Sequence, residues 1–225
     1  MNKLNHVAFI MDGNGRWGKK KKKSRNSGHI AGVKTVQKIV EISLKLKIPI
    51  VTFYVFSTEN WKRPKNEINF LFNLISSYFK KEIKNVVSNN IKINILGKMQ
   101  NLPISVKRTL KNTIKKTCNN NKLIINLALN YGSKSEINEA IKKINSKNLK
   151  VSEKLIGKNL YTQNLPDPDI LIRTGGKKRL SNFMLWQLAY AELYFLDKLW
   201  PDFNANDLKK IIKNFSTIKR NFGSI

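Results

Sequence analysis

Short apolar runs alternate with longer amphipathic segments along this chain, and this alternation restricts the possible folds more than any other feature. The short runs, which we predict to be strands, lie at residues 7–11, 50–56, 91–96, 123–129 and 170–172, with a less regular one at 193–195. The segments between them repeat apolar residues at helical spacing: Val33, Val36, Val40 and Leu44; Ile68, Leu71, Phe72, Ile75 and Phe79; Val106, Leu110 and Ile114; and Ile137, Ile141 and Ile144. Because repeated strand-helix units imply right-handed crossovers, we predict an α/β fold with a central, mostly parallel sheet of about six strands flanked by helices.

Length and charge narrow the possibilities further. A chain of 225 residues can bury roughly 70% of its unfolded surface, and no stretch reads as a linker, so we expect a single domain over residues 1–225. The formal net charge of +29 predicts acidic partners: nucleic acid, anionic lipid or a phosphorylated small molecule. Charge alone does not choose among them, since lysines among asparagine and isoleucine, as at 142–150, also follow from biased composition.

Cysteine content and the lengths of the apolar runs bear on the compartment. Cys118 is the only cysteine, which excludes an intrachain disulfide and a cysteine-based metal site. The run at 7–11 is too short for a signal peptide, and no run is long enough to span a bilayer. We therefore expect a cytoplasmic protein, with the inner face of the membrane as a further place for its basic surface to bind.

Polar motifs follow four of the predicted strands. They lie at residues 12–17, 57–63, 130–132 and 173–181. Because ligands of parallel sheets bind beyond the carboxyl ends of the strands, we expect the four motifs to meet at one edge of the sheet and to form one site.

The first motif combines small residues with charges. It consists of Asp12, Gly13, Asn14, Gly15, Arg16 and Trp17. Backbone N–H groups at the glycines can turn toward an anion, and the arginine adds a fixed positive charge. An aspartate here would repel a bare phosphate, so we expect Asp12 to hold a Mg²⁺ ion that the phosphate also binds. An ordinary Asn-Gly turn is the alternative interpretation.

Two further basic residues follow this motif. We expect Arg25 to contact phosphate, because a guanidinium fork suits phosphate oxygens. His29, near the start of the next helix, fits a structural role as well as a functional one.

The motif after the second strand combines polar groups with a large aromatic residue. Asn60 could position a substrate or relay a proton, Trp61 could pack against an apolar ligand, and Arg63 could pair with phosphate or with Glu59. The same segment also fits a simple helix entry, with Pro64 near the first helical position. Both interpretations can hold together.

The segment 173–203 places charged groups in apolar, aromatic surroundings. Arg173 and Arg179 suit phosphate oxygens, and Ser181 could add a hydroxyl donor. Glu192, at the edge of an apolar run, needs an arginine or a metal as its partner. A structural ion pair between Glu192 and one of these arginines is the alternative to a binding role.

Several common signatures are absent from the sequence. It contains no Asp-Asp-x-x-Asp cluster, no Gly-Lys-Ser/Thr phosphate loop, no Gly-x-Gly-x-x-Gly and no Gly-x-Ser-x-Gly. These absences disfavour the usual nucleotide-binding and serine-hydrolase functions.

Taken in order, five blocks carry a family resemblance. They are HVAFIMDGNGRW, the pair Gly28-His29, FSTENWKRP, NYG, and RTGGKKRLSNFMLWQLAYAELYF with LWPDF. Together they resemble the cis-prenyltransferase family, in particular its bacterial undecaprenyl diphosphate synthases, over nearly the whole chain.

The resemblance implies a Mg²⁺-dependent transferase. Such an enzyme condenses isopentenyl diphosphate repeatedly onto an allylic diphosphate, usually farnesyl diphosphate, and makes a long Z-polyprenyl diphosphate with release of pyrophosphate. The expected product is undecaprenyl diphosphate, a lipid carrier for cell-envelope glycans, since residues 68–89 show no clear insertion. The resemblance also implies a homodimer.

The resemblance further assigns roles to individual residues. Asp12 would be the catalytic aspartate and a Mg²⁺ ligand, Asn60 would accept a proton, and Glu192 would be a second metal ligand that reaches across from the partner subunit. The residues implied to bind substrate are Gly13, Asn14, Gly15, Arg16, Trp17, Arg25, His29, Ser57, Thr58, Glu59, Trp61, Arg63, Arg173, Arg179, Leu180 and Ser181.

The growing hydrocarbon would need an apolar tunnel. Its expected lining is Phe9, Phe53, Val55, Ile95, Leu127 and the helix at 68–79, all of which serve equally well as ordinary core.

Three features depart from the family pattern. Lys177 stands where glutamate is common, Ser133-Lys134 replaces a usual Gly-Arg, and the lysine run 19–23 replaces a more varied spacer. We interpret the lysine run as a solvated basic segment that favours anionic membrane surfaces.

Two rival functions are disfavoured. A nucleic-acid-binding module would interleave aromatic residues with basic ones, whereas here the aromatics lie in apolar runs, so we expect no nucleic-acid partner. A catalytically silent subunit of a two-component prenyltransferase would have a broken first motif, and residues 12–17 are intact.

Overall fold

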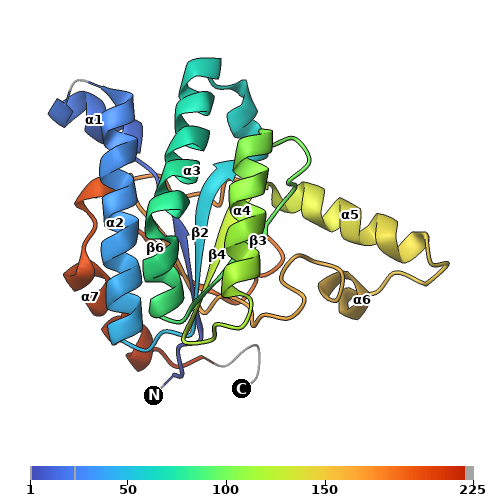
Figure 1. Ribbon diagram of the computed structural model, residues 1–225. Coiled ribbons are helices and arrows are strands. Elements are labelled where there is room, and N and C mark those ends of the chain that lie inside the picture. Colours follow the sequence, from blue (N-terminus) through green and yellow to red (C-terminus); the bar gives the residue numbers. More distant parts are fainter. Residues whose placement is uncertain (1, 23, 221–225) are drawn as a thin grey trace.

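The computed structural model describes residues 2–22 and 24–220, which form a sheet of six strands with helices packed around it (Figure 1). The strands are β1 (His6–Ile10), β2 (Ile50–Ser57), β3 (Ile91–Leu96), β4 (Leu123–Tyr131), β5 (Ile170–Arg173) and β6 (Glu192–Phe195). The α-helices are α1 (Asn14–Lys22), α2 (Arg25–Lys45), α3 (Lys65–Ser88), α4 (Ile104–Thr117), α5 (Ser133–Asn145), α6 (Glu153–Gly157) and α7 (Ala205–Thr217). Two short 3₁₀ helices, η1 (Thr58–Lys62) and η2 (Trp200–Asp202), complete the described elements.

All six strands run parallel, in the order β3-β4-β2-β1-β5-β6, which confirms the predicted α/β class. Within the sheet, β2 lies on one side of β1 and β5 lies on the other, so the strand order reverses at β1. Ile10 is level with Tyr54 of β2 and with Arg173 of β5, so β1 and β5 end side by side while β2 continues to Ser57. Such a reversal of strand order is where parallel sheets bind their ligands.

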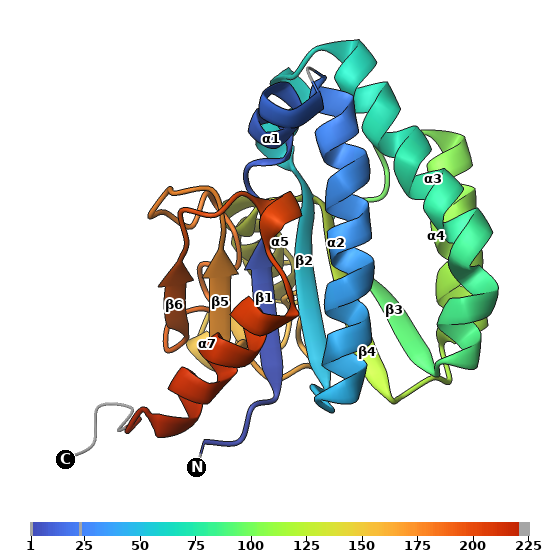
Figure 2. The same cartoon turned by 90° about the vertical axis from the view of Figure 1, so that its left-hand side faces the viewer.

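The two faces of the sheet are covered differently. Val7 and Phe9 point into the larger core, which is closed by α2, α3, α4 and α7 (Figure 2). Ala8 and Ile10 point to the opposite face, which is covered by the segment from Phe183 to Leu188. On that side α5 and α6 form a small cluster of their own, to which Trp186 adds. Alternate residues of each strand therefore serve separate cores, as the two-residue repeat of a strand requires.

Helix α2 uses a different face from the one that its valine repeat predicts. Its fully buried residues are Gly28, Gly32, Thr35, Ile39, Ile42 and Ser43. Val36, Val40 and Leu44 are only partly buried at the edge of the core. Asn14 packs directly against both glycines, which leaves no room for a side chain. A Cβ on Gly28 would lie 1.8 Å from the Asn14 carbonyl oxygen, and one on Gly32 would lie 2.2 Å from its side-chain oxygen.

The lysine run ahead of Arg25 is largely helical. Lys19 to Lys22 belong to α1, while Lys23 lies outside the described residues. Helices α1 and α2 meet where Gly18 approaches Ser24 and Gly28; a Cβ on Gly18 would lie 2.0 Å from the Ser24 oxygen. This contact keeps the first motif fixed against the start of α2.

A row of buried polar side chains crosses four strands. His6 Nδ1 lies 2.8 Å from the Pro166 carbonyl, which only accepts, and its Nε2 lies 2.7 Å from Thr52 Oγ1. Asn126 donates to Thr52 at 2.9 Å and accepts from Asn94 at 3.1 Å. Burial lowers the pKa of His6 to about 4, so the ring is neutral, carries its proton on Nδ1 and accepts from Thr52 through Nε2.

The connection from β5 to β6 is held down by α5 and the end of β4. The Leu185 amide donates to Ser133 Oγ at 2.9 Å, and Gln187 donates to the buried Glu136 carboxylate at 3.2 Å. Tyr131 also donates to Glu136, at 2.5 Å, and burial raises the pKa of that carboxyl. The serine that departs from the family pattern thus anchors this connection directly.

Among the described residues, no helix combines the length and apolarity that crossing a bilayer demands.

Candidate active site

A cavity of about 720 Å³ opens at the carboxyl ends of β1, β2 and β5, as the positions of the polar motifs predict. Its lining is Ile10, Met11, Asp12, Gly13, Asn14, Gly15, Arg16, Arg25, His29, Tyr54, Val55, Ser57, Glu59, Asn60, Arg63, Leu71, Arg173, Arg179, Ser181 and Asn182. Three of the four expected motifs meet there. The fourth, at 130–132, lies partly within β4, because that strand extends to Tyr131.

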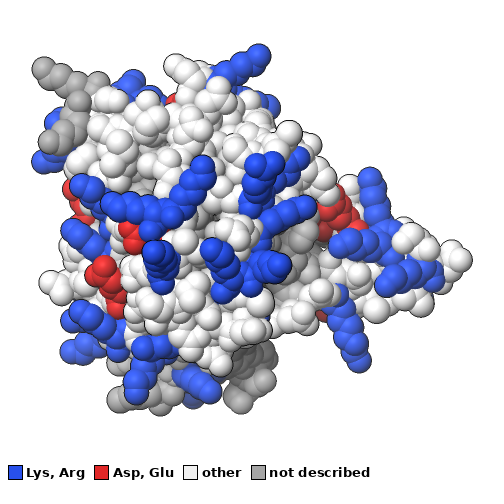
Figure 3. Space-filling model, in the orientation of Figure 1, with Lys and Arg blue, Asp and Glu red and all other residues white. Residues whose placement is uncertain are grey.

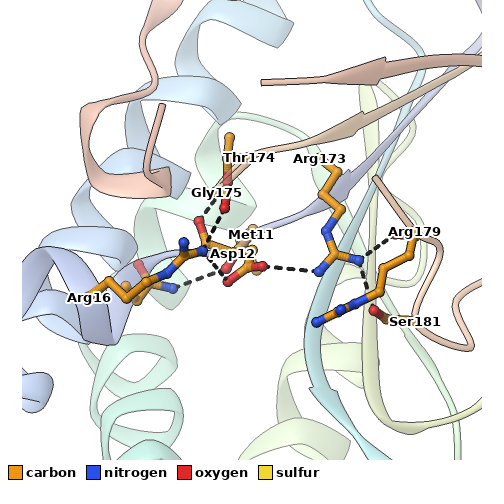
Figure 4. A network of polar contacts seen from close by, with 9 residues as sticks. Met11, Asp12, Arg16, Arg173, Thr174, Gly175, Arg179 and Ser181 are labelled. Atoms are coloured by element: carbon orange, nitrogen blue, oxygen red, sulfur yellow. Dashed lines mark hydrogen bonds and ion pairs between the residues drawn. The ribbon is translucent and has the colours of Figure 1, made fainter. Parts of the chain in front are cut away.

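Asp12 lies between two arginines, as Figure 4 shows. Its Oδ1 is 3.2 Å from Arg16 Nη2, and its Oδ2 is 3.0 Å from Arg173 Nη2. Its backbone oxygen accepts from the Thr174 hydroxyl at 2.8 Å. The first and last motifs are therefore joined through one carboxylate.

Gly175 permits this close arrangement. Its φ is +90°, and a Cβ there would lie 2.5 Å from Arg16 Nη2 and 3.0 Å from Asp12 Cγ. Arg16 Nη2 also donates to the Gly175 carbonyl at 2.7 Å. Only glycine combines this backbone conformation with the space that the ion pair occupies.

Arg173 is the most deeply placed cation of the site, with 3% of its surface exposed. Its Nη1 donates to Ser181 Oγ at 2.8 Å and to the Arg179 carbonyl. Its Nε is buried without a hydrogen-bond partner. Arg179 is exposed at the cavity wall, and among the described residues it forms no ion pair. A donor that is buried, unpaired and beside a free guanidinium suits an anionic ligand.

Glu67 organises a second basic cluster. Arg25 donates to it through Nε at 3.1 Å and Nη2 at 3.0 Å, and Arg63 donates through Nη1 at 3.2 Å. His29 Nε2 lies 3.4 Å from the same carboxylate without hydrogen-bond geometry. Burial acts to raise the pKa of Glu67, but Arg25, Arg63 and His29 together lower it. Burial lowers the pKa of His29, against the attraction of Glu67.

Asn60 closes the start of η1 and also faces the cavity. The Ser57 amide donates to its Oδ1 at 3.2 Å, within a reciprocal capping box. Its neighbour Glu59 accepts from Asn182 at 2.8 Å. Burial acts to raise the pKa of Glu59, but the hydrogen bonds, that from Asn182 foremost, lower it.

A second, apolar cavity of about 120 Å³ adjoins the first between α2 and α3. Met11, Asn14, His29, Val55 and Leu71 line both spaces. Its farther wall includes Phe53, Leu74, Ile75, Tyr78, Phe79, Leu127 and Trp200. Phe9 and Ile95 are not part of this wall; Phe9 instead stacks on Phe53 within the core.

Four of the residues predicted to bind substrate lie off the cavity lining. Trp17 donates to Asp202 at 2.7 Å, and Trp61 donates to Asn130 at 2.7 Å while its ring packs on Phe56. Both indoles thus connect elements around the site. The other two are Thr58, which is next to Gly132, and Leu180, which is packed on the second core.

Glu192 is not brought to Asp12 within one chain. It begins β6 and is level with Ile170, three residues before Arg173, which places it roughly 10 Å down the sheet from the cavity edge. It lies 3.8 Å from Arg220 Nε, so its partner is neither Arg173 nor Arg179. A structural ion pair with either of those two arginines is therefore excluded within the chain.

The donor set at Asp12 fits Mg²⁺ only together with a substrate. Among the described residues, no group of three or more histidine, cysteine or acidic side chains is arranged to hold a metal ion. Mg²⁺ often binds through one or two carboxylates, with waters and substrate phosphates completing its shell. Asp12, at the cavity with arginines on both sides, supplies such a carboxylate.

Sequence reasoning missed three residues that shape the site: Glu67, Tyr54 and Asn182. Glu67 lies in the first turn of α3, where an acidic residue is common, so nothing local marks it as part of the site. Tyr54 extends from β2 and donates to the Ser181 carbonyl at 3.2 Å. Asn182 follows Ser181 directly, and its place beside the predicted clamp was the available signal.

Lys177 and Lys134, two of the residues that depart from the family pattern, lie outside the cavity lining.

Comparison with known proteins identifies the family. Residues 10–223 match the prenyltransferase family described as "Putative undecaprenyl diphosphate synthase". The isoprenyl transferase of Clostridium tetani is 45% identical over 98% of this chain and 89% of its own length, and that of Rickettsia typhi is 44% identical over 99% of both.

Solved structures agree with this match. The "probable undecaprenyl diphosphate synthase" of Campylobacter jejuni is 37% identical, with a TM-score of 0.85 over 100% of both chains. Lavandulyl diphosphate synthase of Lavandula x intermedia, solved with dimethylallyl diphosphate, is 32% identical, with a TM-score of 0.93 over 98% of both chains. The chain is thus a cis-prenyltransferase, a member of the undecaprenyl diphosphate synthase family.

Proposed function

We propose that this enzyme condenses isopentenyl diphosphate repeatedly onto an allylic diphosphate, with farnesyl diphosphate as the primer and undecaprenyl diphosphate as the product. The observation that carries the proposal is one cavity with two arginine clusters, opening into an apolar space between α2 and α3. Two diphosphates and one hydrocarbon chain are the substrates that such a combination suits.

In this proposal each cluster binds one diphosphate. The second basic cluster, with Arg25, Arg63 and His29, would hold the allylic diphosphate, helped by Arg16 and by backbone N–H groups at the α1 N-terminus. The cluster of Arg173, Arg179 and Ser181 would hold isopentenyl diphosphate. Arg173 already points two nitrogens at Ser181 and Asp12, so its orientation needs no rearrangement.

Loss of the allylic diphosphate develops negative charge on the leaving oxygens. The arginines and the backbone N–H groups would stabilise that charge. Mg²⁺, held by Asp12 and the diphosphates, would supply further positive charge at the same oxygens. Asn60, which lines the same cavity, would relay the proton that the condensing isopentenyl carbon gives up to the released pyrophosphate.

The length of the product demands movement. At roughly 30 Å³ for a group the size of water, about 120 Å³ accommodates about one five-carbon unit. A polyprenyl chain would therefore have to separate α2 from α3, whose facing side chains Val36, Leu74 and Tyr78 form the wall.

We also propose a homodimer in which Glu192 serves the partner's site. Edge strand β6 supports this, because Leu193 is 44% exposed and the preceding Tyr190 is 67% exposed. Mixing Asp12→Ala and Glu192→Ala subunits tests the arrangement. If Glu192 acts across the interface, mixed dimers regain one intact site and activity returns; if both residues serve the same subunit, the mixture stays inactive.

The scattered basic surface supports binding of the enzyme to an anionic membrane, into which a lipid product would pass. Lysine and arginine side chains extend over much of the face that Figure 3 shows, with few acidic ones among them. Such binding should weaken with added salt.

The proposed reaction is tested by incorporation of labelled isopentenyl diphosphate in the presence of farnesyl diphosphate and Mg²⁺, with products separated by chain length. Asp12→Asn should abolish incorporation, while Asp167→Asn, an exposed aspartate outside the cavity lining, should leave it unchanged. A wild-type enzyme that makes no prenyl product, or an Asp12→Asn variant with full activity, would refute the proposal.

A further inference from the structure

Asn182 lines the cavity and lies where its own segment meets η1 and the start of α5. Its backbone has a φ of +61°, and Ser181 before it has a φ of +51°. Two successive left-handed residues turn the chain sharply, which brings the Ser181 hydroxyl to Arg173 and the Asn182 amide to η1. Asparagine adopts this conformation more readily than most residues.

The polar groups of Asn182 connect its segment to two other elements, η1 and α5. Its Nδ2 donates to Glu59 Oε1 at 2.8 Å, which ties it to η1. Its Oδ1 accepts from the Lys134 amide at 2.9 Å, and its backbone oxygen accepts from the Ser133 amide at 2.8 Å. The two amides belong to the first turn of α5, where a helix has no backbone acceptors of its own.

The geometry leaves little freedom at this junction. A Cβ on Gly132 would lie 2.8 Å from Asn182 Nδ2 and 2.6 Å from Thr58 Oγ1, so three segments are packed against one another. An aspartate at 182 would present an oxygen where Asn182 donates, and Glu59 would then face a second carboxylate. The side chain must therefore be a donor toward η1 and an acceptor toward α5.

We propose that Asn182 is a positioning residue that fixes the Arg173–Ser181 clamp relative to η1, and thereby sets the affinity for isopentenyl diphosphate. This inference rests on the proposed function, which assigns that substrate to the clamp. Asn182 lines the cavity beside Ser181 and acts through its neighbours.

A double-mutant cycle tests the link to Glu59. Asn182→Asp should raise KM for isopentenyl diphosphate about tenfold, the effect of losing one charge-assisted hydrogen bond, with a smaller change in kcat. In a Glu59→Gln background the same substitution should cost no more than about twofold, because the glutamine amide can donate to the new carboxylate. A tenfold cost in both backgrounds would overturn the inference.

The pH dependence separates positioning from a general loss of structure. In Asn182→Asp, the paired carboxylates raise the pKa of one another, and a proton shared between them restores a donor. The ratio of variant to wild-type KM should therefore fall as pH is lowered, and it should stay constant in the double variant. A ratio that does not change with pH in the single variant would contradict the proposed contact.

Hydrogen exchange tests the link to α5 without any turnover. Asn182→Gly permits the positive φ but removes both side-chain hydrogen bonds, so the Lys134 amide should exchange at least about tenfold faster, while the core strand β4 stays protected. Asn148→Gly is the matched control, since Asn148 also has a positive φ, of 53°, and lies at the far end of α5. Unchanged exchange at Lys134 would overturn the inference. A wild-type enzyme that makes no prenyl product would refute the proposed function instead, and the exchange experiment can be read in either case.

Discussion

Replacing Glu67 by glutamine tests whether one buried carboxylate organises the second basic cluster. Glutamine preserves the size of the side chain but removes the charge that Arg25, Arg63 and His29 share. Glu67 is 8% exposed, so its hydrogen bonds to charged donors fall in the range of roughly 1.5–3 kcal/mol. Arg25 is about half exposed and water can replace its partner, which lowers the expected loss in unfolding free energy to about 1–3 kcal/mol.

The pH dependence of this loss has a definite sign. Because the pKa of Glu67 is lowered in the folded state, its carboxylate stabilises the fold fully above its ordinary pKa of 4.5, and this contribution disappears as pH falls below that value. The difference between wild type and Glu67→Gln should therefore be largest at neutral pH and should shrink in acid. His29, whose pKa is lowered, is neutral at pH 7 and contributes little to the difference there.

Denaturant unfolding at several pH values measures the effect, together with KM for the allylic diphosphate. KM should rise because Arg25 and Arg63 lose the group that orients them. Glu82→Gln, on the same helix and outside the cavity lining, is the matched control; Glu82 accepts from Asn85, and its substitution should leave both quantities unchanged. A loss of less than about 0.5 kcal/mol at neutral pH with unchanged KM would refute the role of Glu67.

Three further substitutions should have distinct effects. Gly175→Ala should lower the free energy of unfolding by about 1–3 kcal/mol, because alanine is strained at this positive φ. It should also reduce activity, because the new Cβ displaces Arg16, and a stable, fully active variant would contradict the contact. Arg173→Lys should raise KM for isopentenyl diphosphate at least about tenfold, since lysine cannot contact Ser181 and Asp12 together, whereas the exposed Arg108→Lys should not. Tyr78→Ala should lengthen the products seen by chromatography, because it enlarges the apolar cavity between α2 and α3, and an unchanged length distribution would count against that wall as the limit.

Most strands could be predicted from the sequence because nearly all of their residues are buried, as in β1, β2, β4 and β5; the exposed edge strand β6 is the exception. Runs such as 50–56 and 91–96 are apolar almost throughout, and the structure places β2 and β3 within one residue of the predicted bounds. The end of β4 was predicted two residues too early. Asn130 reads as a loop residue, yet it stays in the strand because its side chain is bonded to Trp61 and to the Lys98 carbonyl.

The helix faces and the site depended more on distant partners. Valines along α2 suggested the buried face, but close packing against α1 and η2 selected the glycine face instead, which no local repeat reveals. Three of the four sequence motifs meet at the cavity as predicted, since parallel strands end at one edge, whereas the motif at 130–132 lies partly within β4. Glu67 was overlooked because Arg25 and His29 precede it by some forty residues.

The buried polar row from His6 to Asn94 also bears on how the sheet can assemble. His6, Thr52 and Asn126 each have both a donor and an acceptor paired, and Asn94 donates to Asn126, so the row is complete only when β1, β2, β4 and β3 are aligned as they are here. A slip of one strand by a single residue would move its polar member to the other face and leave its neighbours buried without partners. The apolar residues around the row tolerate many alignments, whereas the row tolerates one. During folding the row would thus favour the native strand alignment, because misaligned sheets that bury as much apolar surface would still leave polar groups without partners.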